Sequence, residues 1–324
     1  MDRRKIIALL GGTILASPLE VHGQEPGRTY RIGALYISPR DAPPYIALYD
    51  ELSRLGFVEG QNLQVDGPGY GLRPEQFRQH AAELAKAKVD VIVCVGAAAI
   101  RAAQQATATI PILGVTDDMV AEGLVRSLAN PGGNTTGVSI LATELDGKRQ
   151  ELLIELMPGA RRIAGLADSL VAGPNKVQAL QDTARGRGVE VAIHTVGTPE
   201  EIAPAIDAAK ASGVAGLNVL ASPFFFANRR IIFERAAALG LPAMYQFPEM
   251  AQEGGLVAYG PSIVQIYRQQ LSRLLVQLLR GTKPADLPVQ QPTTFELVVN
   301  LKTAKALGLT IPESFLARAD DVIE

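Results

Sequence analysis

From Tyr30 onward, short runs of apolar and β-branched residues alternate with longer amphipathic stretches. The short runs are typical of strands that are buried on both faces, and the longer stretches are typical of helices that cover a sheet. The pattern therefore predicts an α/β protein with parallel sheets flanked by helices. A first set of strands is expected at residues 31–37, 62–66, 89–95, 110–115 and 137–140, and a second at 162–167, 189–195, 215–220, 243–246 and 256–259.

Helices are expected in the gaps between these strands. Several of them run up to a glycine, such as Gly56, Gly188 or Gly213, which supplies a left-handed cap without a Cβ penalty. A longer helix with one apolar stripe, a last strand and a short helix follow towards the C-terminus. The clearest helical patterns lie at residues 45–55, 74–87, 179–187, 199–211, 262–280 and 301–307, and the last strand at 295–299.

An internal repeat connects the two sets of strands. The stretch DDMVAEGLV from Asp117 is similar to PEMAQEGGLV from Pro248, with matches at a constant offset of 131 residues. Repeated segments of this kind indicate a duplicated structural unit, so the halves are predicted to be copies of one lobe. The first lobe is expected over 28–138 plus about 263–290, and the second over 139–262 plus about 291–324.

The composition narrows the class of partner. The 324 residues carry 31 Lys and Arg against 33 Asp and Glu, a net charge of -2, and include no Trp. Such a chain has neither the positive field nor the aromatic platforms of a nucleic-acid-binding protein. The expected partner is therefore a small molecule.

The N-terminus has the pattern of a secretory signal peptide. Arg3, Arg4 and Lys5 precede an apolar run over residues 6–16, and small and polar residues follow. A membrane span needs about 20 apolar residues, so stable membrane insertion is not expected. We expect a signal peptide over 1–24 that is cleaved near Gly23; a frayed or buried N-terminal helix of a cytosolic protein is the alternative.

Several long strings resemble one family of ABC-importer substrate-binding proteins, which includes the tryptophan/tyrosine-type binding proteins. The resemblance runs from about Arg28 to Glu324 and implies a periplasmic-binding-protein type I fold. In that fold two Rossmann-like lobes, joined by three crossovers, hold a ligand in the cleft between them. The strings are RLGFVEGQNL, NPGGNTTGVS, ASPFFFANRRIIFERAAALGLPAMY, GGLVAYGPS and QQPTTFELVVNLKTAKALGLTIPESFLARADDVIE.

The resemblance also implies a function. It predicts a monomeric periplasmic protein that captures an amino acid or a small carboxylate, aromatic ones included, by closure of its lobes. The permease and ATPase would be encoded elsewhere, because no GxxxxGK[ST] motif is present. The alternative is a soluble ligand-sensing receptor subunit of the same fold that acts with a membrane sensor.

The carboxyl ends of the first set of strands supply candidate ligand residues, because ligands lie there in open α/β sheets. At Gly96 and Ala97 a carboxylate could approach the backbone N–H groups, although small residues also allow close helix–sheet packing. Asp117 could hold an ammonium group or cap the next helix. The candidates are Ser38, Gly96, Ala97, Thr116, Asp117 and Ser139.

The second set of strands offers corresponding candidates. Tyr245 and Tyr259 stand at strand ends, where a phenol can stack on a ligand and donate a hydrogen bond, or support the loop as part of the wall. The resemblance implies an acidic residue in many members of that family where Ser222 stands; if that acid binds a ligand amine, its absence here counts against an amino-acid ligand. The candidates are Ser222, Tyr245, Gln246 and Tyr259.

The sequence predicts no catalytic residues, no metal and no cofactor. His22, His80 and His194 have no suitable partner nearby in sequence, and the chain lacks the GxSxG, HExxH and paired Cys and His patterns. The first expected strand ends in YISPRDAPP and not in the GxGxxG of a dinucleotide site. A cytosolic regulator of the same fold would need a DNA-binding headpiece, whereas this N-terminus is apolar. A binding protein is therefore favoured over an enzyme.

Overall fold

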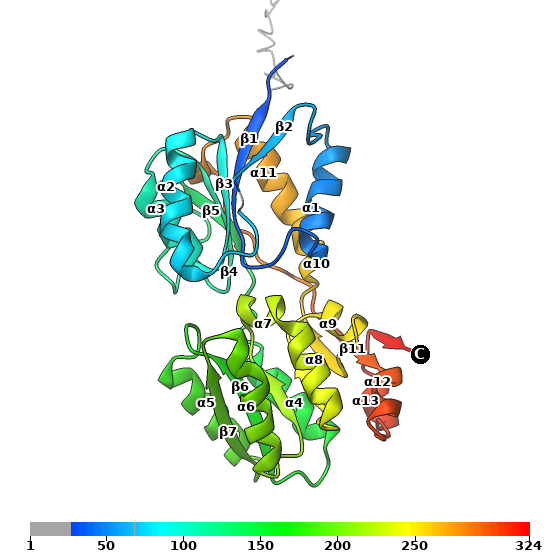
Figure 1. The fold of residues 1–324 in the computed structure, drawn as a ribbon. Helices are drawn as coiled ribbons and strands as arrows, with labels where there is room; N and C mark the ends of the chain where they lie inside the picture. The colour runs from blue at the N-terminus through cyan, green and yellow to red at the C-terminus, as the bar shows by residue number, and fades with distance from the viewer. Residues whose placement is uncertain (1–26, 68) are drawn as a thin grey trace, which may run out of the picture.

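The computed structural model describes residues 27–67 and 69–324, and the expected signal peptide lies outside them. Two stacked lobes, each with its own sheet, make up the molecule (Figure 1). The two sets of strands expected from the sequence are both present, with ends that differ by up to two residues. The first lobe contains β1 Tyr30–Leu35, β2 Leu63–Asp66, β3 Val91–Val95, β4 Ile112–Thr116 and β5 Thr135–Ser139.

The second lobe repeats the topology of the first. The first sheet has the order β2-β1-β3-β4-β5, and the second sheet has the order β7-β6-β8-β9-β10 followed by β11 and β12. All pairs are parallel except β10 with β11, which is antiparallel. The strands are β6 Arg162–Asp168, β7 Glu190–Val196, β8 Leu217–Val219, β9 Ala243–Tyr245, β10 Val257–Gly260, β11 Glu296–Asn300 and β12 Asp321–Ile323.

Helices cover both sheets, and α6 Pro199–Ala211 illustrates why they begin and end where they do. Thr198 and Glu201 form a capping box at its start, Pro199 occupies the first turn, and Gly213 follows its end. The other helices of the first lobe are α1 Pro43–Arg54, η1 Pro74–Gln76, α2 Phe77–Ala87, α3 Ala97–Ala106, α10 Ile263–Gln265, η2 Ile266–Leu271, α11 Ser272–Leu279 and η3 Pro284–Asp286. Those of the second lobe are α4 Asp146–Leu156, α5 Pro174–Arg185, α7 Pro223–Ala227, α8 Arg229–Ala238, α9 Pro248–Gln252, α12 Leu301–Ala306 and α13 Glu313–Leu316.

The chain passes between the lobes three times. The first crossover joins β5 to α4, the second joins β10 to α10, and the third runs from Gln290, which pairs with Val138 of β5, to β11. Because the long helix after β10 packs against α1, it returns the chain to the first lobe, where Figure 1 shows it in orange. The long helix expected at 262–280 contains a π-helical stretch, η2, which follows α10 after the second crossover. These connections direct the carboxyl ends of both parallel sheets towards the interface between the lobes.

Candidate functional site

Three hydroxyl side chains gather at the strand tips of the first lobe. Ser38, Thr116 and Ser139 are each at most 4% exposed. Thr116 Oγ1 donates to Glu122 Oε2 at 2.7 Å, and Ser139 Oγ accepts the Met119 N–H at 3.0 Å. Burial raises the pKa of the Tyr45 hydroxyl, and hydrogen bonding with Ser38 opposes that rise. The structure therefore brings these three predicted residues to one edge, where they also hold the loops in place.

The start of α3 lies against the second lobe. Gly96 precedes the helix with a φ of +86°, a conformation that favours glycine, and Ala97 is its first residue. A Cβ placed on Gly96 would lie 3.8 Å from Cγ of Pro223, the first residue of α7. The starts of α3 and α7 therefore lie close to each other across the lobe interface.

Asp117 contacts the first crossover. Its carboxylate accepts the Thr143 N–H at 2.7 Å and also the Thr143 hydroxyl. Burial raises the pKa of Asp117 to about 6, and the hydrogen bond from Thr143 and the nearby Lys176 ammonium oppose that rise. No helix follows directly, so Asp117 does not cap one; Asp118 instead accepts the N–H groups of the local turn.

In the second lobe, Ser222 and Gln246 bind each other. The Ser222 N–H donates to Gln246 Oε1 at 2.8 Å, and Gln246 Nε2 donates to the Ser222 carbonyl at 2.9 Å. The Ser222 hydroxyl accepts the Phe224 N–H, which caps α7, and donates to Asp168 Oδ2 at 2.5 Å. Asp168 is the last residue of β6 and is 5% exposed. A carboxylate thus stands one hydrogen bond away from Ser222.

The two predicted tyrosines differ in their surroundings. Tyr245 is 2% exposed, and its ring packs edge-on against Phe233 of α8 with centroids 5.1 Å apart. Burial raises the pKa of Tyr245 well above its usual range. Tyr259 is partly exposed, and its ring packs on the apolar cluster beside α4 while its carbonyl accepts Arg149 Nη1 at 3.0 Å. These contacts favour the wall role over ligand stacking, most clearly for Tyr245.

The sequence analysis missed three groups of this interface, namely Asp168 and the buried pair Asp146 and Arg149. Asp146 accepts Arg149 Nη2 at 2.5 Å and the Ala221 N–H at 2.9 Å, and Lys176 Nζ lies 2.5 Å from its other oxygen. Arg149 also donates to the carbonyl oxygens of Ala142, in the first crossover, and of Tyr259, in β10. The detectable signal for Asp168 was an acidic residue ending an apolar strand, RIAGLAD. Asp146 and Arg149 form an i,i+3 pair that only the fold shows to be buried.

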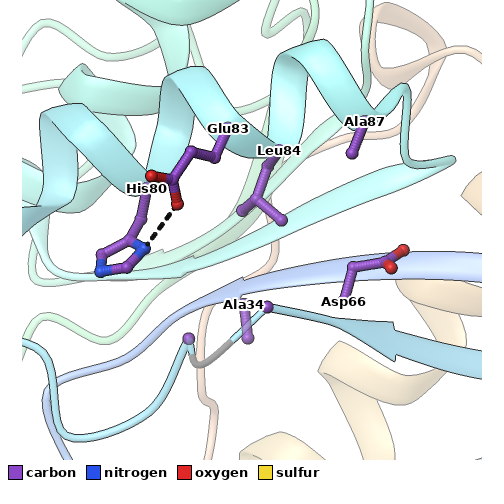
Figure 2. A pocket seen from close by; sticks show the side chains of 8 residues that line it. Ala34, Asp66, His80, Glu83, Leu84 and Ala87 are labelled. Carbon is purple, nitrogen blue, oxygen red and sulfur yellow. Dashed lines mark hydrogen bonds and ion pairs between the residues drawn. The ribbon is translucent and has the colours of Figure 1, made fainter.

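A small cavity of about 130 Å³ lies elsewhere, between α2 and the strands β1 and β2 of the first lobe (Figure 2). His80 Nδ1 lies 3.1 Å from Glu83 Oε2 at its edge. Ligand pockets usually measure about 300–1,000 Å³, so this cavity is small for an organic ligand. In residues 27–67 and 69–324, no group of three or more His, Cys, Asp or Glu is placed to hold a metal ion. Nor does any helix of that part of the chain have the length and apolarity to cross a membrane.

Comparison with known proteins identifies the family. The chain is 28% identical to the tyrosine-binding protein of Clostridioides difficile (strain R20291), over 78% of this chain and 73% of that protein. Among solved structures, a conserved domain protein of Vibrio cholerae matches with a TM-score of 0.80 at 26% identity, over 91% of this chain and all of that one. A Streptococcus pneumonia ABC domain in complex with L-Trp matches with a TM-score of 0.78, at the same identity and coverage.

These matches confirm the fold predicted from the sequence, the periplasmic-binding-protein type I fold with two Rossmann-like lobes. The family model described as ABC transporter substrate binding protein matches residues 45–323, which is most of the chain. The predicted resemblance is therefore confirmed as well. The chain belongs to the family of ABC transporter substrate-binding proteins.

Proposed function

We propose that this protein is the periplasmic solute-binding component of an ABC importer and captures an amino acid between its lobes. Family membership supports the transport role, and an expected cleavage near Gly23 would release the mature monomer. Its partners are then a permease and an ATPase encoded elsewhere. The relatives described as tyrosine-binding and as complexed with L-Trp support an aromatic amino acid as the ligand.

The contact between Asp168 and Ser222 is the main support for an amino acid as the ligand, in preference to a carboxylate without an amine. The family resemblance implies an acid in many members at the position of Ser222, and the Ser222 hydroxyl of this chain donates to Asp168 at 2.5 Å. Because Asp168 is 5% exposed and ends β6 at the interface, its carboxylate supplies the negative partner for a ligand ammonium group. The end of β6 thus provides the negative charge that Ser222 lacks.

The first lobe supplies the matching partner for the ligand carboxylate. The first turn of α3, at Ala97, has backbone N–H groups without partners inside the helix, and Thr116 and Ser139 lie at neighbouring strand tips. A ligand that contacts both walls binds the closed arrangement more tightly than the open one. It therefore shifts the lobes towards closure by this difference in affinity.

Calorimetry on the mature chain tests the proposal. L-Tyr, L-Trp and L-Phe are titrated alongside 3-phenylpropionate and indole-3-acetate, which lack the amine. Asp168→Asn should weaken binding of the amino acid about tenfold or more, as expected for the loss of a charged hydrogen bond, and should not weaken binding of the amine-free acids.

Asp182→Asn, on the exposed face of α5, is the matched control and should bind as the unsubstituted protein does. The proposed ligand class fails if none of the amino acids binds. The role of Asp168 fails if Asp168→Asn retains full affinity for an amino acid that does bind.

A further inference from the structure

Two of the three crossovers are held by a carboxylate that reaches from the adjoining lobe. The first crossover spans residues 140–145, between β5 and α4, and the second spans residues 261–262, between β10 and α10. Any rotation of one lobe against the other must change backbone angles in these short segments. Groups that fix their conformation therefore influence the angle between the lobes.

At the first crossover, Asp117 holds the chain at Leu141 and again at Thr143. The Asp117 carbonyl accepts the Leu141 N–H at 2.9 Å, and its carboxylate accepts the N–H and the hydroxyl of Thr143. Leu141 has a φ of +53°, in the left-handed region that costs a branched residue about 1 kcal/mol or more. The contacts from Asp117 offset this strain, so they select one conformation of the crossover.

At the second crossover, Glu249 of α9 makes the corresponding contact. Its Oε1 accepts the Ser262 hydroxyl at 2.5 Å and the Val264 N–H, in the first turn of α10, at 2.9 Å. Glu249 is 7% exposed, and its Oε2 is buried with no hydrogen-bond partner in the part of the chain that the structure describes. A buried carboxylate oxygen without a hydrogen bond destabilises the folded state. The contacts that Oε1 makes with the second crossover give a reason for an acid at this position.

We propose that Asp117 and Glu249 are positioning residues for lobe closure, each clamping one crossover in the conformation that keeps the lobes together. Asp117 extends from the first lobe to the entrance of α4 in the second, and Glu249 extends from the second lobe to the start of α10 in the first. The clamps bias the ligand-free protein towards the closed arrangement and so reduce what the ligand must contribute to closure. This inference goes beyond the proposed function and concerns the protein without ligand.

Distance measurements between the lobes in the ligand-free protein test the clamps. Spin labels are attached to Ala82→Cys on α2 and Ala208→Cys on α6, two exposed positions in different lobes. The native Cys94 is fully buried and does not compete for the label. Asp117→Ala and Glu249→Ala should each enlarge the population at long distance about tenfold, because each removes two hydrogen bonds to a crossover.

Two neighbouring acids serve as matched controls. Asp118 accepts the N–H groups of Val120 and Ala121 within its own loop, and Glu253 pairs with Arg229 within the second lobe. Asp118→Ala and Glu253→Ala should leave the distance distribution unchanged. Asp117→Asn should restore it, because the amide can accept the Thr143 N–H while the Thr143 hydroxyl reverses its role.

The clamps are refuted if Asp117→Ala and Glu249→Ala keep the original distribution while remaining folded by circular dichroism, or if Asp118→Ala shifts it equally. If Asp117→Ala does not fold, Thr143→Val removes the hydroxyl contact and gives the same test. Since no ligand is used, these outcomes are independent of whether an amino acid binds.

Discussion

The repeated segments after β4 and β9 have the same backbone hydrogen bonds but use their side chains differently. In the first lobe the N–H groups of Glu122, Gly123 and Leu124 donate to the carbonyls of residues 118, 120 and 119. In the second lobe the N–H groups of residues 253, 254 and 255 donate to those of residues 249, 251 and 250. Every donor and acceptor is displaced by 131 residues. The turn is thus a shared feature of the duplicated lobe.

The charged groups on these turns have separate roles. Asp118 binds its own loop, whereas Glu249 at the matching position binds the second crossover; in the first lobe the neighbouring Asp117 makes the crossover contact. Glu122 accepts the Thr116 hydroxyl, whereas Glu253 accepts Nε and Nη2 of Arg229. The comparison teaches that apolar and glycine positions preserve the turn, which leaves the charged positions free to diverge in function.

The largest expected effect tests the shared core of the two turns. Met119 and Met250 are matched residues, and both are 0% exposed. Met119→Ala and Met250→Ala should each lower the free energy of unfolding by about 2–5 kcal/mol, measured by urea denaturation, because each leaves a cavity. Val120→Ala, at an exposed position, should cost less than about 0.5 kcal/mol. A negligible loss in one of the methionine variants would break the packing equivalence of the turns.

A smaller effect is expected at the matched glycines. Gly123 has a φ of +66° and Gly254 a φ of +122°, with open space around the position of a Cβ in both cases. Alanine should therefore act through backbone strain alone. We expect a loss of about 1 kcal/mol for Gly123→Ala and of about 2–3 kcal/mol for Gly254→Ala, which lies further from the left-handed minimum. Equal losses in urea denaturation would contradict this ranking.

The smallest effect concerns pH. Burial raises the pKa of Glu122 to about 6 from its usual 4.5, although the Thr116 hydroxyl opposes this. The folded state then binds more protons than the unfolded state between about pH 4.5 and 6, so the contribution of Glu122 to stability rises as the pH falls through this window. Glu122→Gln should reduce the change in the free energy of unfolding between pH 7 and 4.5 by about 1 kcal/mol, allowing for solvent screening.

Denaturation midpoints of the two proteins between pH 7 and 4.5 check this prediction. Glu122→Gln should gain stability relative to the unsubstituted protein at pH 7, and the difference should shrink towards pH 4.5. Parallel profiles would show that Glu122 does not titrate in this range.

Much of the fold could be predicted because its signals are local. Apolar runs located the strands of both lobes, and the spacing of the repeat identified the duplication that the shared strand order confirms. The short strand β12 was not expected, since three residues, DVI, carry too little pattern to recognise. The antiparallel pairing of β11 with β10 was also not foreseen, because the sequence pattern does not encode strand direction.

The candidate site was predictable only as a set of strand tips. The rule that ligands lie beyond the carboxyl ends selected Thr116 and Ser222, and the structure places Thr116 at the end of β4 and Ser222 at the start of α7, after β8. The same rule covers Asp168, at the end of the apolar strand RIAGLAD, but the sequence could not show its contact with Ser222, which joins residues 54 positions apart. Nor could the rule distinguish a wall role from ligand stacking for Tyr245, because its packing on Phe233 depends on how α8 lies against the sheet.

The amino-acid sequence by itself determined the class of this protein: an α/β chain with a duplicated lobe, strings typical of one family, and no recognised catalytic motif. These properties follow from periodicity and local spacing, which are properties of the sequence alone. The tertiary structure alone decided which carboxylates reach the crossovers, which pair inside a lobe, and which stand at the interface. Those outcomes depend on contacts between residues distant in sequence, and such contacts exist only after both sheets have formed and the lobes have met.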